Sequence, residues 1–370
     1  MISGSDAHAV RKMLISRYIE ISVFKAVALV AGALVTLFSL LEFVEQLASV
    51  GHGRYRVIDA LDYVLLTAPS RLLQVTPVSV LLGCLLALGG LAHNLELTAM
   101  QSLGMSRRRI IGSVLRLMLP IIIVILFMME LAIPPAQQLA QEQRSSALST
   151  STSLHSDKSY WMQKDRQFLN VQRFEHGEVP VGIDVYAFNT DGSLQSILHA
   201  DRADIRRDGT WLLKNVSKKH PDSSQLATEI FATLPWPSFL ARQNIQFLIL
   251  PPADIAPLAL FRHIRTLAKH HQNTTRYEQA LWAKISVPLS IVAMALSTAP
   301  FVFGLTRTQG RGANLARGVG FGIMFSLGQQ ILARLGLLLN FSPVITATAL
   351  PLTVIALALY LLRSGENRAR

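Results

Sequence analysis

Residues 72–92, LLQVTPVSVLLGCLLALGGLA, form a run of 21 residues without a charged side chain, between Arg71 and His93. A helix needs about 20 mostly apolar residues to cross the hydrocarbon core of a bilayer. Every backbone polar group in that core must be hydrogen-bonded within the protein, and a helix does this within a single run. The run therefore predicts a membrane-spanning helix.

Five further runs have a spanning length and few or no charges. They are residues 26–41, 110–133 (with Arg116 and Glu130 inside), 285–306, 314–339 (with Arg317 and Arg334 inside) and 344–362. The first run is too long for a cleaved signal peptide, and Glu42 follows it where a small-residue cleavage site would stand. We therefore expect an α-helical membrane protein with six transmembrane helices.

Residues 134–280 have a different character, because they are polar and hold no spanning run. Alternation of period two predicts short strands, at residues 168–172, 181–188, 211–213, 228–233 and 245–250. Turn dipeptides separate strand-like segments, at Asp191-Gly192 and Asp208-Gly209. This pattern predicts an inserted all-β domain, a small sandwich or jelly roll. The predicted domains are residues 1–133 (three transmembrane helices and a short helix at 93–105), 134–257 (the β jelly roll), 258–280 (an amphipathic connecting helix) and 281–370 (three transmembrane helices).

The chain is both apolar and basic. Hydrophobic residues make up 51% and charged residues 16% of it, the mean hydropathy is +0.37, and the net charge is +12. This composition excludes a disordered chain and argues against a purely soluble domain, since soluble domains carry roughly 25% charged residues. Residues 134–280 hold 16 Lys+Arg and 14 Asp+Glu, a net of +2, which leaves +10 to the membrane-spanning part. A nucleic-acid binder would cluster its basic residues on one soluble face, so no nucleic-acid partner is expected.

The basic residues predict the orientation in the membrane, because Lys and Arg near span ends collect on the cytoplasmic side. With the N-terminus inside, the inside segments carry Arg11, Lys12, Arg17, Arg107, Arg108, Arg109, Arg307, Arg311, Arg317, Arg363, Arg368 and Arg370. The short outside segments carry only Arg54, Arg56 and Arg71. We therefore expect both termini in the cytoplasm and the β domain outside it. The single cysteine, Cys84, lies in the second span, so the exported domain has no disulfide.

Motifs of nucleotide hydrolysis and of common enzymes are missing from the sequence. It contains no G-x-x-x-x-G-K-[ST], H-E-x-x-H, C-x-x-C or G-x-S-x-G, so neither ATP binding by a phosphate loop nor enzymatic activity is expected. His263 and His270-His271 share the predicted amphipathic helix, but a metal site needs more ligands at suitable spacing. We expect no metal and no other cofactor on this chain.

The connection between the second and third spans is the most informative loop. Residues 93–106 read HNLELTAMQSLGMS, in which Leu95, Met100 and Leu103 form an approximate apolar stripe and Gly104 is a helix stop. A short amphipathic helix between two spans would lie at the cytoplasmic surface, on lipid or in a groove of a soluble partner. ABC permeases couple to their ATPases in this way.

Short motifs are distributed along nearly the whole chain. They are Arg17-Tyr18-Ile19, Phe43-Val44-Glu45-Gln46-Leu47, Pro69 and Pro77, Leu81-Leu82-Gly83, Leu88-Gly89-Gly90-Leu91, the stretch ELTAMQSLG at 96–104, Tyr277, Trp282, Lys284 and Pro288, Phe303-Gly304, and Gly320-Phe321-Gly322. With these motifs the chain resembles the lipopolysaccharide-export permeases of the LptF/LptG family. Trp282-Ala283-Lys284 favours the G-type branch.

The resemblance implies a permease subunit of an ABC transporter in the Gram-negative inner membrane. The subunit would extract lipopolysaccharide from the outer leaflet and pass it to a bridge of periplasmic β jelly rolls. The implied partners are an LptF-type permease subunit, a dimeric cytoplasmic LptB-type ATPase that holds the ATP, and a single-span LptC-type bridge protein. The resemblance also places the termini in the cytoplasm and the β domain in the periplasm.

The resemblance further implies substrate contacts by outer basic residues, which would meet the phosphates of lipid A. Arg71 matches a basic family position at the outer mouth, and Arg144 matches a family arginine near the route to the jelly roll. Arg54 and Arg56, in the first outer loop, are weaker candidates. A purely anchoring, snorkelling role is the alternative for Arg71, and an ordinary surface charge is the alternative for Arg144.

Glu96 matches the family's glutamate that docks in the ATPase groove, and its coupling neighbours would be Leu95, Met100, Leu103 and Gly104. A helix-capping or solvated carboxylate is the alternative interpretation of Glu96.

The chain departs from the family at the outer end of the first span, where lysines are frequent. Glu42, Ala48 and Ser49 stand at the matching positions, which puts phosphate contact through this helix in doubt. Glu130 and Arg334 lie within spans, where ionisable residues are functional candidates, although both could snorkel.

Two other function classes stay open on the residues alone. A glycolipid-modifying enzyme would need paired carboxylates or a nucleophile in the β domain. The nearest pair, Asp201 and Asp204, stands three residues apart and would point to opposite faces of a strand. A membrane scaffold with a β-rich interaction domain would show no dependence on an ATPase.

Overall fold

The computed structural model describes residues 4–148, 160–164, 166–175, 179–189, 192–206, 210–221, 226–237, 251–269, 274–303, 311–339 and 341–367. The chain divides into two compact units. The first comprises Met1–Val44, Thr67–Pro134 and Ala256–Arg370, and the second comprises Glu45–Leu66 and Pro135–Ile255.

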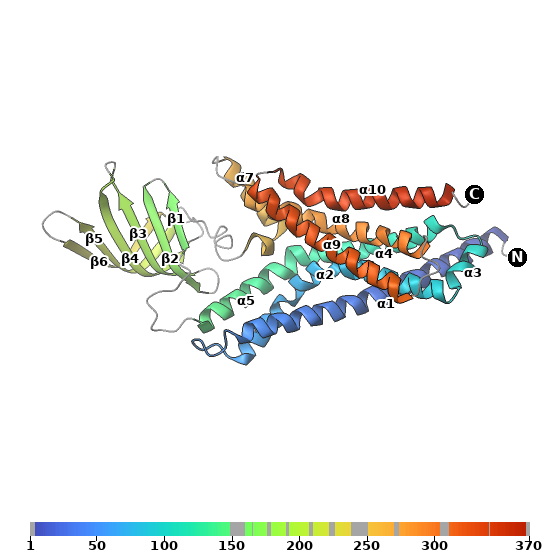
Figure 1. Ribbon diagram of the computed structural model, residues 1–370. Helices are drawn as coiled ribbons and strands as arrows, with labels where there is room; N and C mark the ends of the chain where they lie inside the picture. The colour runs from blue at the N-terminus through green and yellow to red at the C-terminus, as the bar shows by residue number, and fades with distance from the viewer. Residues whose placement is uncertain are drawn as a thin grey trace. The chain divides into compact units, whose positions relative to one another are not determined.

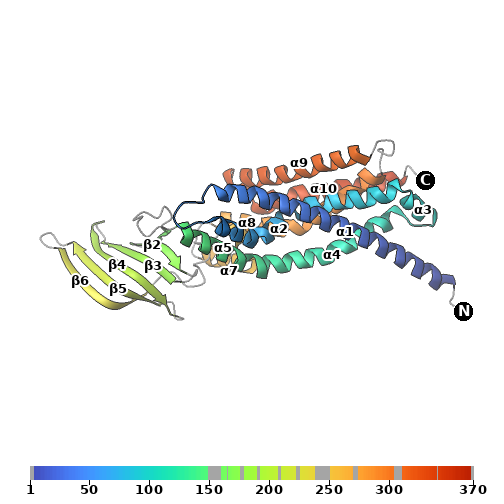
Figure 2. The ribbon, with the colours of Figure 1, turned by 90° about the horizontal axis from the view of Figure 1, so that it is seen from below.

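Six helical segments among the described residues are long and apolar enough to cross a membrane, which confirms the predicted number. The helices are α1 (Gly4–Leu47), α2 (Val57–His93), α3 (Glu96–Ser102), α4 (Arg107–Phe127), the π-helix η1 (Met128–Ala132), α5 (Ile133–Leu148), α7 (Pro257–Lys269), α8 (Thr275–Phe303), α9 (Arg311–Leu338) and α10 (Pro343–Asn367). Within the first unit, α3 lies at the same end of the helices as the start of α1 and the end of α10 (Figures 1 and 2).

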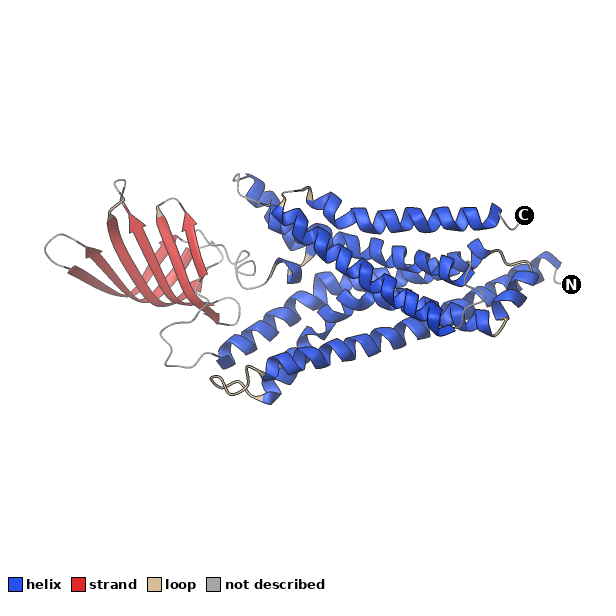
Figure 3. Cartoon of the chain, viewed as in Figure 1, coloured by secondary structure: helices blue, strands red, loops and turns tan. Residues whose placement is uncertain are grey.

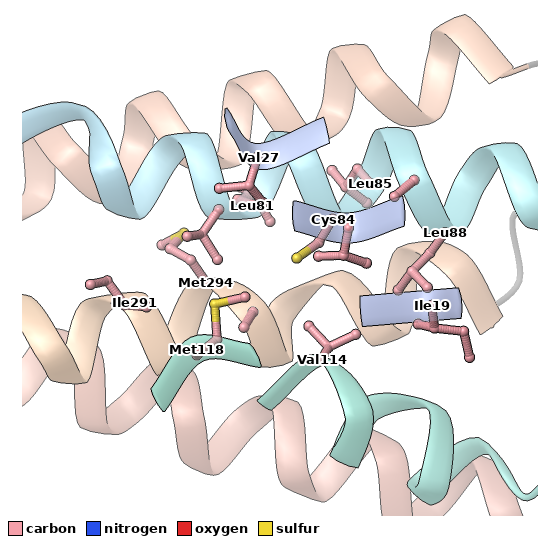
Figure 4. Packing of buried hydrophobic residues seen from close by; sticks show 14 of the residues in the cluster. Ile19, Val27, Leu81, Cys84, Leu85, Leu88, Val114, Met118, Ile291 and Met294 are labelled. Carbon is pink, nitrogen blue, oxygen red and sulfur yellow. The ribbon is translucent and has the colours of Figure 1, made fainter. Parts of the chain in front are cut away.

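Side chains of α1, α2, α4 and α8 form much of the core of the first unit. Figure 4 shows these residues: Ile19 and Val27 of α1, Leu81, Cys84, Leu85 and Leu88 of α2, Val114 and Met118 of α4, and Ile291 and Met294 of α8. Lipid tails are as apolar as these side chains, so close van der Waals packing has to hold such helices together. Cys84 is fully buried there as a small packing residue.

The third spanning segment continues past residue 133, close to which the sequence analysis starts the β domain. α4 runs through η1 into α5, and the first described strand begins at Tyr160. Pro134 and Pro135 lack the N–H that a helix interior uses, and their rings crowd the carbonyls four residues earlier. A wider π turn directly before them relieves this crowding. The helix therefore passes two prolines without ending.

The second unit contains one antiparallel sheet, drawn in red in Figure 3. Its strands are β1 (Tyr160–Lys164), β2 (Gln167–Glu175), β3 (Val179–Phe188), β4 (Leu194–Ile205), β5 (Thr210–Pro221) and β6 (Leu226–Pro237). Their order in space is their order in sequence, as Figure 1 shows. The all-β insertion is confirmed, and the described strands are joined as a meander.

The strand predictions succeed where alternation is regular. The predicted strands at 168–172, 181–188, 211–213 and 228–233 lie in β2, β3, β5 and β6, whereas β1 and β4 had not been predicted. The predicted strand at 245–250 lies outside the described residues, as do Asp191 and the dipeptide Asp208-Gly209. Gly192, in the β3–β4 turn, has a φ of +84°, which glycine adopts without strain.

One face of the sheet is apolar from strand to strand, because buried side chains stand opposite one another in the register. Leu169 pairs with Val185, and Val185 pairs with Leu198. Trp211 and Trp236 also pair, with ring centroids 5.9 Å apart. We call this the inner face and the opposite one the outer face.

In β4 and β5 the alternation of buried and exposed side chains is interrupted at one point, which we call the offset. Ala200 and Ala203 are both buried in β4, and Leu213 and Val216 are both buried in β5, although regular alternation buries every second residue. Asn215 lies at this point with a φ of 52°, in the left-handed region that asparagine tolerates. Both strands change together, so their pairing continues across the offset.

This offset corrects the expectation that Asp201 and Asp204 point to opposite faces. Each follows a buried alanine, so both lie on the outer face. The Asp204 carboxylate is 2.6 Å from Lys214 Nζ, and Asp201 accepts a hydrogen bond of 3.0 Å from Asn215 Nδ2. Each carboxylate therefore has its own partner.

Candidate functional site

The α2–α4 connection begins with a sharp reversal of the backbone at Leu95. This residue has a φ of 61°, which is uncommon for a side chain of its size, and α3 starts directly after it. The helix ends at Ser102, about two turns later, and Gly104 follows with a φ of +86°, which favours glycine. The Ser106 side chain then accepts a hydrogen bond from the Arg109 N–H and caps α4. The seven-residue helix is thus bounded by two tight turns.

Glu96 stands in the first turn of α3, where the helix dipole favours an acidic side chain. Its Oε2 accepts a hydrogen bond of 3.0 Å from the Tyr18 hydroxyl of α1, and its Oε1 accepts one of 3.4 Å from Asn94 Nδ2. Both donors are neutral, so the carboxylate is oriented without being neutralised. Sequence reasoning missed this role of Tyr18, because 78 residues separate the two side chains.

The side chains of the predicted apolar stripe of α3 do not all face the same way, because one packs in the core and two are exposed. Met100 is only 8% exposed and packs in the core of the first unit together with Leu97, which is not among the predicted coupling residues. Leu95 and Leu103 are 68% and 59% exposed, and Gly104 is also exposed. Of the predicted coupling residues, Leu95, Leu103 and Gly104 are therefore accessible, and Met100 anchors the helix.

A polar contact joins α1 to α4 close to this connection. The hydroxyls of Ser16 and Ser113 are hydrogen-bonded to each other, and Arg116 Nη2 donates to Ser16 Oγ at 3.2 Å. Arg116 Nη1 also lies 3.8 Å from Glu20 Oε1. Because Tyr18 lies between Ser16 and Glu20, the same segment of α1 holds both α3 and α4.

Arg71 of α2 is buried, with 8% of its surface exposed. Its guanidinium donates to Thr67 Oγ1 at 2.7 Å and to Ser39 Oγ of α1 at 3.2 Å, and it lies 3.6 Å from Glu42 Oε2. Ser39 and Glu42 are one turn apart on α1, so they meet the guanidinium together. An anion that reaches Arg71 would have to compete with Glu42.

Arg144 lies in α5 of the second unit, beside Tyr63 of α2. Its guanidinium carbon is 5.5 Å from the centre of the Tyr63 ring, a cation–π contact. Its Nε is buried and has no hydrogen-bond partner among the described residues. A buried donor without a partner costs free energy, so Arg144 has unused capacity for an acceptor.

The loop after α1 packs against the end of α5. The Arg54 N–H donates to the Ala147 carbonyl at 2.8 Å, and a Cβ added to Gly53 would come within 2.7 Å of the same oxygen. The Arg54 and Arg56 side chains are exposed. The second unit therefore brings Arg54 and Arg144 to the same part of the fold, whereas Arg71 belongs to the first unit.

Glu130, a candidate ionisable residue within a span, has a structural contact. It lies in η1, and its Oε2 accepts a hydrogen bond of 3.2 Å from the Leu258 N–H in the first turn of α7. A carboxylate at a helix N-terminus satisfies an otherwise unpaired N–H. Arg334, the other such candidate, is exposed on α9.

His263 of α7 is packed against α8. Its ring meets the Tyr277 ring edge-on, with centroids 4.8 Å apart, and burial lowers the pKa of His263. His270 and His271 lie outside the described residues. Within the described part of the chain, no three His, Cys, Asp or Glu side chains are grouped so that they could hold a metal ion.

The sequence matches one family model over residues 17–364, that of the lipopolysaccharide export system permease LptF/LptG. It is 28% identical over 351 residues to the lipopolysaccharide export system permease protein LptG of Escherichia coli K12, covering 94% of this chain and 98% of that protein. It is 30% identical over 321 residues to the LptG protein of Haemophilus influenzae, covering 86% of this chain and 90% of that protein.

Proposed function

The chain belongs to the LptF/LptG family of lipopolysaccharide-export permeases, and from this membership we propose that it is a G-type permease subunit of an ATP-driven transporter. It would extract lipopolysaccharide from the outer leaflet of the inner membrane and pass it to a periplasmic bridge of β jelly rolls. The family consists of permease subunits, so the chain is a non-catalytic membrane component. In this proposal a dimeric LptB-type partner binds and hydrolyses the ATP, and an LptF-type subunit supplies the second helical bundle.

The observation that carries the proposal is the structure of α3 and its two flanking turns. A helix of seven residues is held between two spanning helices, with Leu95 and Leu103 exposed and the Glu96 carboxylate oriented by Tyr18. An apolar edge beside an oriented acid suits a groove with basic residues on a soluble partner. A partner that moves α3 would move α2 and α4 with it, because the connections on both sides are short.

We assign substrate contact to Arg71 of the first unit and to Arg144, Arg54 and Arg56 of the second. Charge-assisted hydrogen bonds from guanidinium groups to phosphate are short and strong. Arg54 and Arg56 expose their side chains, and Arg144 has an unused donor. Arg71 would exchange Glu42 for a lipid phosphate, so its contact is coupled to the packing of α1 on α2.

The proposed orientation follows from the basic residues. Both termini would lie in the cytoplasm, and the β domain would lie in the periplasm, next to an LptC-type bridge protein. Support comes from the fold of the first unit, where α3, the start of α1 and the end of α10 lie at one end (Figure 1).

The test is ATP-dependent release of lipopolysaccharide from proteoliposomes that contain this chain, its F-type partner, the bridge protein and the ATPase. Glu96→Ala and Glu96→Lys should reduce co-purification of the ATPase or lower the lipopolysaccharide released per ATP hydrolysed. Glu229→Ala removes an exposed carboxylate from β6 and serves as the matched control. Unchanged assembly and release in both Glu96 variants would refute the coupling role, and failure of any ATPase to co-purify would refute the transporter.

A further inference from the structure

The outer face of the sheet carries an aromatic patch, which we define as Trp161, Phe168, Tyr186 and Phe188. Trp161 is 56% exposed and stacks on Tyr186, with ring centroids 5.9 Å apart and an angle of 20° between the planes. Phe168 meets Phe188 edge-on at 5.5 Å. Phe168, Tyr186 and Phe188 are half-buried around the exposed Trp161. Apolar side chains that gather at the surface of one face mark a binding surface.

A polar row adjoins this patch across neighbouring strands. In the register Trp161 stands opposite Asn170, Asn170 opposite Asp184, and Asp184 opposite His199. His199 Nδ1 is 2.6 Å from Asp184 Oδ1, and its Nε2 is 3.7 Å from Asp201 Oδ1. The row therefore offers hydrogen-bonding groups of fixed orientation beside the rings.

Asn170 provides an independent indication of a missing partner. It stands between Trp161 and Asp184 in the row and is only 9% exposed, yet its Oδ1 has no hydrogen-bond partner among the described residues. Such a group calls for a partner that the described residues do not supply. A ligand hydroxyl is a partner of the required kind.

We propose that the aromatic patch and the polar row together bind a saccharide, and that the occupant is the sugar portion of lipopolysaccharide. The C–H faces of a sugar ring pack against the electron-rich faces of aromatic rings, and its hydroxyls both donate and accept hydrogen bonds. A protein partner would have less use for two carboxylates, an imidazole and an amide directly beside stacked rings, because charged groups are depleted from the centres of protein interfaces. The choice of lipopolysaccharide rests on the proposed function, whereas the saccharide chemistry rests on the sheet alone.

The test is saturation-transfer NMR on the full chain in detergent, with a dephosphorylated core oligosaccharide as the probe. Saturation should pass to sugar C–H protons, and Trp161→Ala should weaken binding about tenfold, the effect of losing one good aromatic contact. Ile230→Ala, which truncates an 81% exposed side chain on the outer face of β6, should leave binding unchanged. Asp184→Asn keeps the shape of the side chain and should weaken binding by removing the charged acceptor.

The outcomes separate this inference from the proposed function. Inorganic phosphate should not compete with the oligosaccharide, and a sugar-free lipid A should not occupy the face. Saturation transfer to an unrelated neutral glycan that is as strong as transfer to the core oligosaccharide would refute the assignment to lipopolysaccharide. The assignment as a saccharide site would stand. No transfer to any sugar, or binding that Trp161→Ala leaves unchanged, would overturn the inference even if ATP-driven lipopolysaccharide release is intact. Capture of a protein partner that Trp161→Ala abolishes would overturn it in favour of a protein interface.

Discussion

Gly83 shows how a single residue sets the distance between two helices. A Cβ added there would lie 2.5 Å from the Val27 Cα of α1, whereas one added to Gly89, in the same helix, would meet nothing within 4 Å. Contacts below 3.0 Å to backbone atoms force the backbone to move. The close approach of α1 and α2 therefore depends on the missing side chain at Gly83.

Gly83→Ala should destabilise the protein by about 1–3 kcal/mol, the usual cost of overpacking a well-packed core. Gly89→Ala is the matched control, and it should be neutral or slightly stabilising because alanine is the better helix former. The difference in unfolding temperature between the two variants is measured by heating each in detergent, with aggregation as the readout. Equal midpoints for the two variants would show that α1 does not approach α2 so closely.

Tyr18→Phe removes only the hydroxyl that orients Glu96. The hydrogen bond is exposed to solvent, so we expect only a modest loss in lipopolysaccharide released per ATP, on the order of threefold. The variant should fold normally, since the ring is kept. In a Glu96→Gln background the same change should have little further effect. A full additional loss in that background would mean that Tyr18 acts by another route.

At the scale of secondary-structure elements, α7 illustrates how a short helix is held by its neighbours. Glu130 accepts a hydrogen bond from the Leu258 N–H in its first turn, and His263 packs on Tyr277 of α8. Leu260 is fully buried, while Leu258 and Phe261 stay exposed. The helix is thus joined to η1 and α8 by a cap and a ring contact.

The packing of α7 should weaken in mild acid. Burial lowers the pKa of His263, so below about pH 6.5 the unfolded segment takes up a proton that the folded segment does not. The stability that the packing of neutral His263 gives to α7 is present above that pH, and it is lost as the pH falls toward the lowered pKa. Hydrogen exchange of α7 amides, compared between the native chain and His263→Phe at pH 7.5 and pH 5.5, isolates this effect. His220→Phe, on β5, is the control, and a native-to-variant difference independent of pH would argue against the prediction.

At the scale of the whole molecule, the arrangement in the membrane can be tested with cysteine labelling. The single native cysteine, Cys84, is buried and should not react with a membrane-impermeant maleimide. Under the proposed orientation, Ile230→Cys in the β domain should be labelled in spheroplasts, and Leu103→Cys, directly after α3, only after the membrane is permeabilised. Both native side chains are exposed, so each new thiol is accessible. The reverse pattern would place the β domain in the cytoplasm.

The sequence was sufficient for elements whose pattern is local. Uncharged runs such as residues 72–92 predict the spanning helices, and alternation predicts β2 and β3, because one face of each strand is buried. A short helix is predicted at 93–105, and α3 spans Glu96–Ser102. The sequence pattern does not predict β4, in which Ala200 and Ala203 are both buried and the period of two is broken. Near residue 133 the composition becomes polar and predicts the end of a helix, whereas the backbone continues through the π-helix η1 into α5, past Pro134 and Pro135.

Composition, charge pattern and periodicity by themselves determined the six spans, the β insertion and the expected orientation, because each is a property of contiguous residues. Only the tertiary structure decided which side chains meet: Glu42 with Arg71, Tyr18 with Glu96, and Glu130 with α7. These contacts depend on how each helix is rotated about its axis and how closely it packs against the next. That information lies in the shapes of many distant side chains together, and no single stretch of sequence carries it.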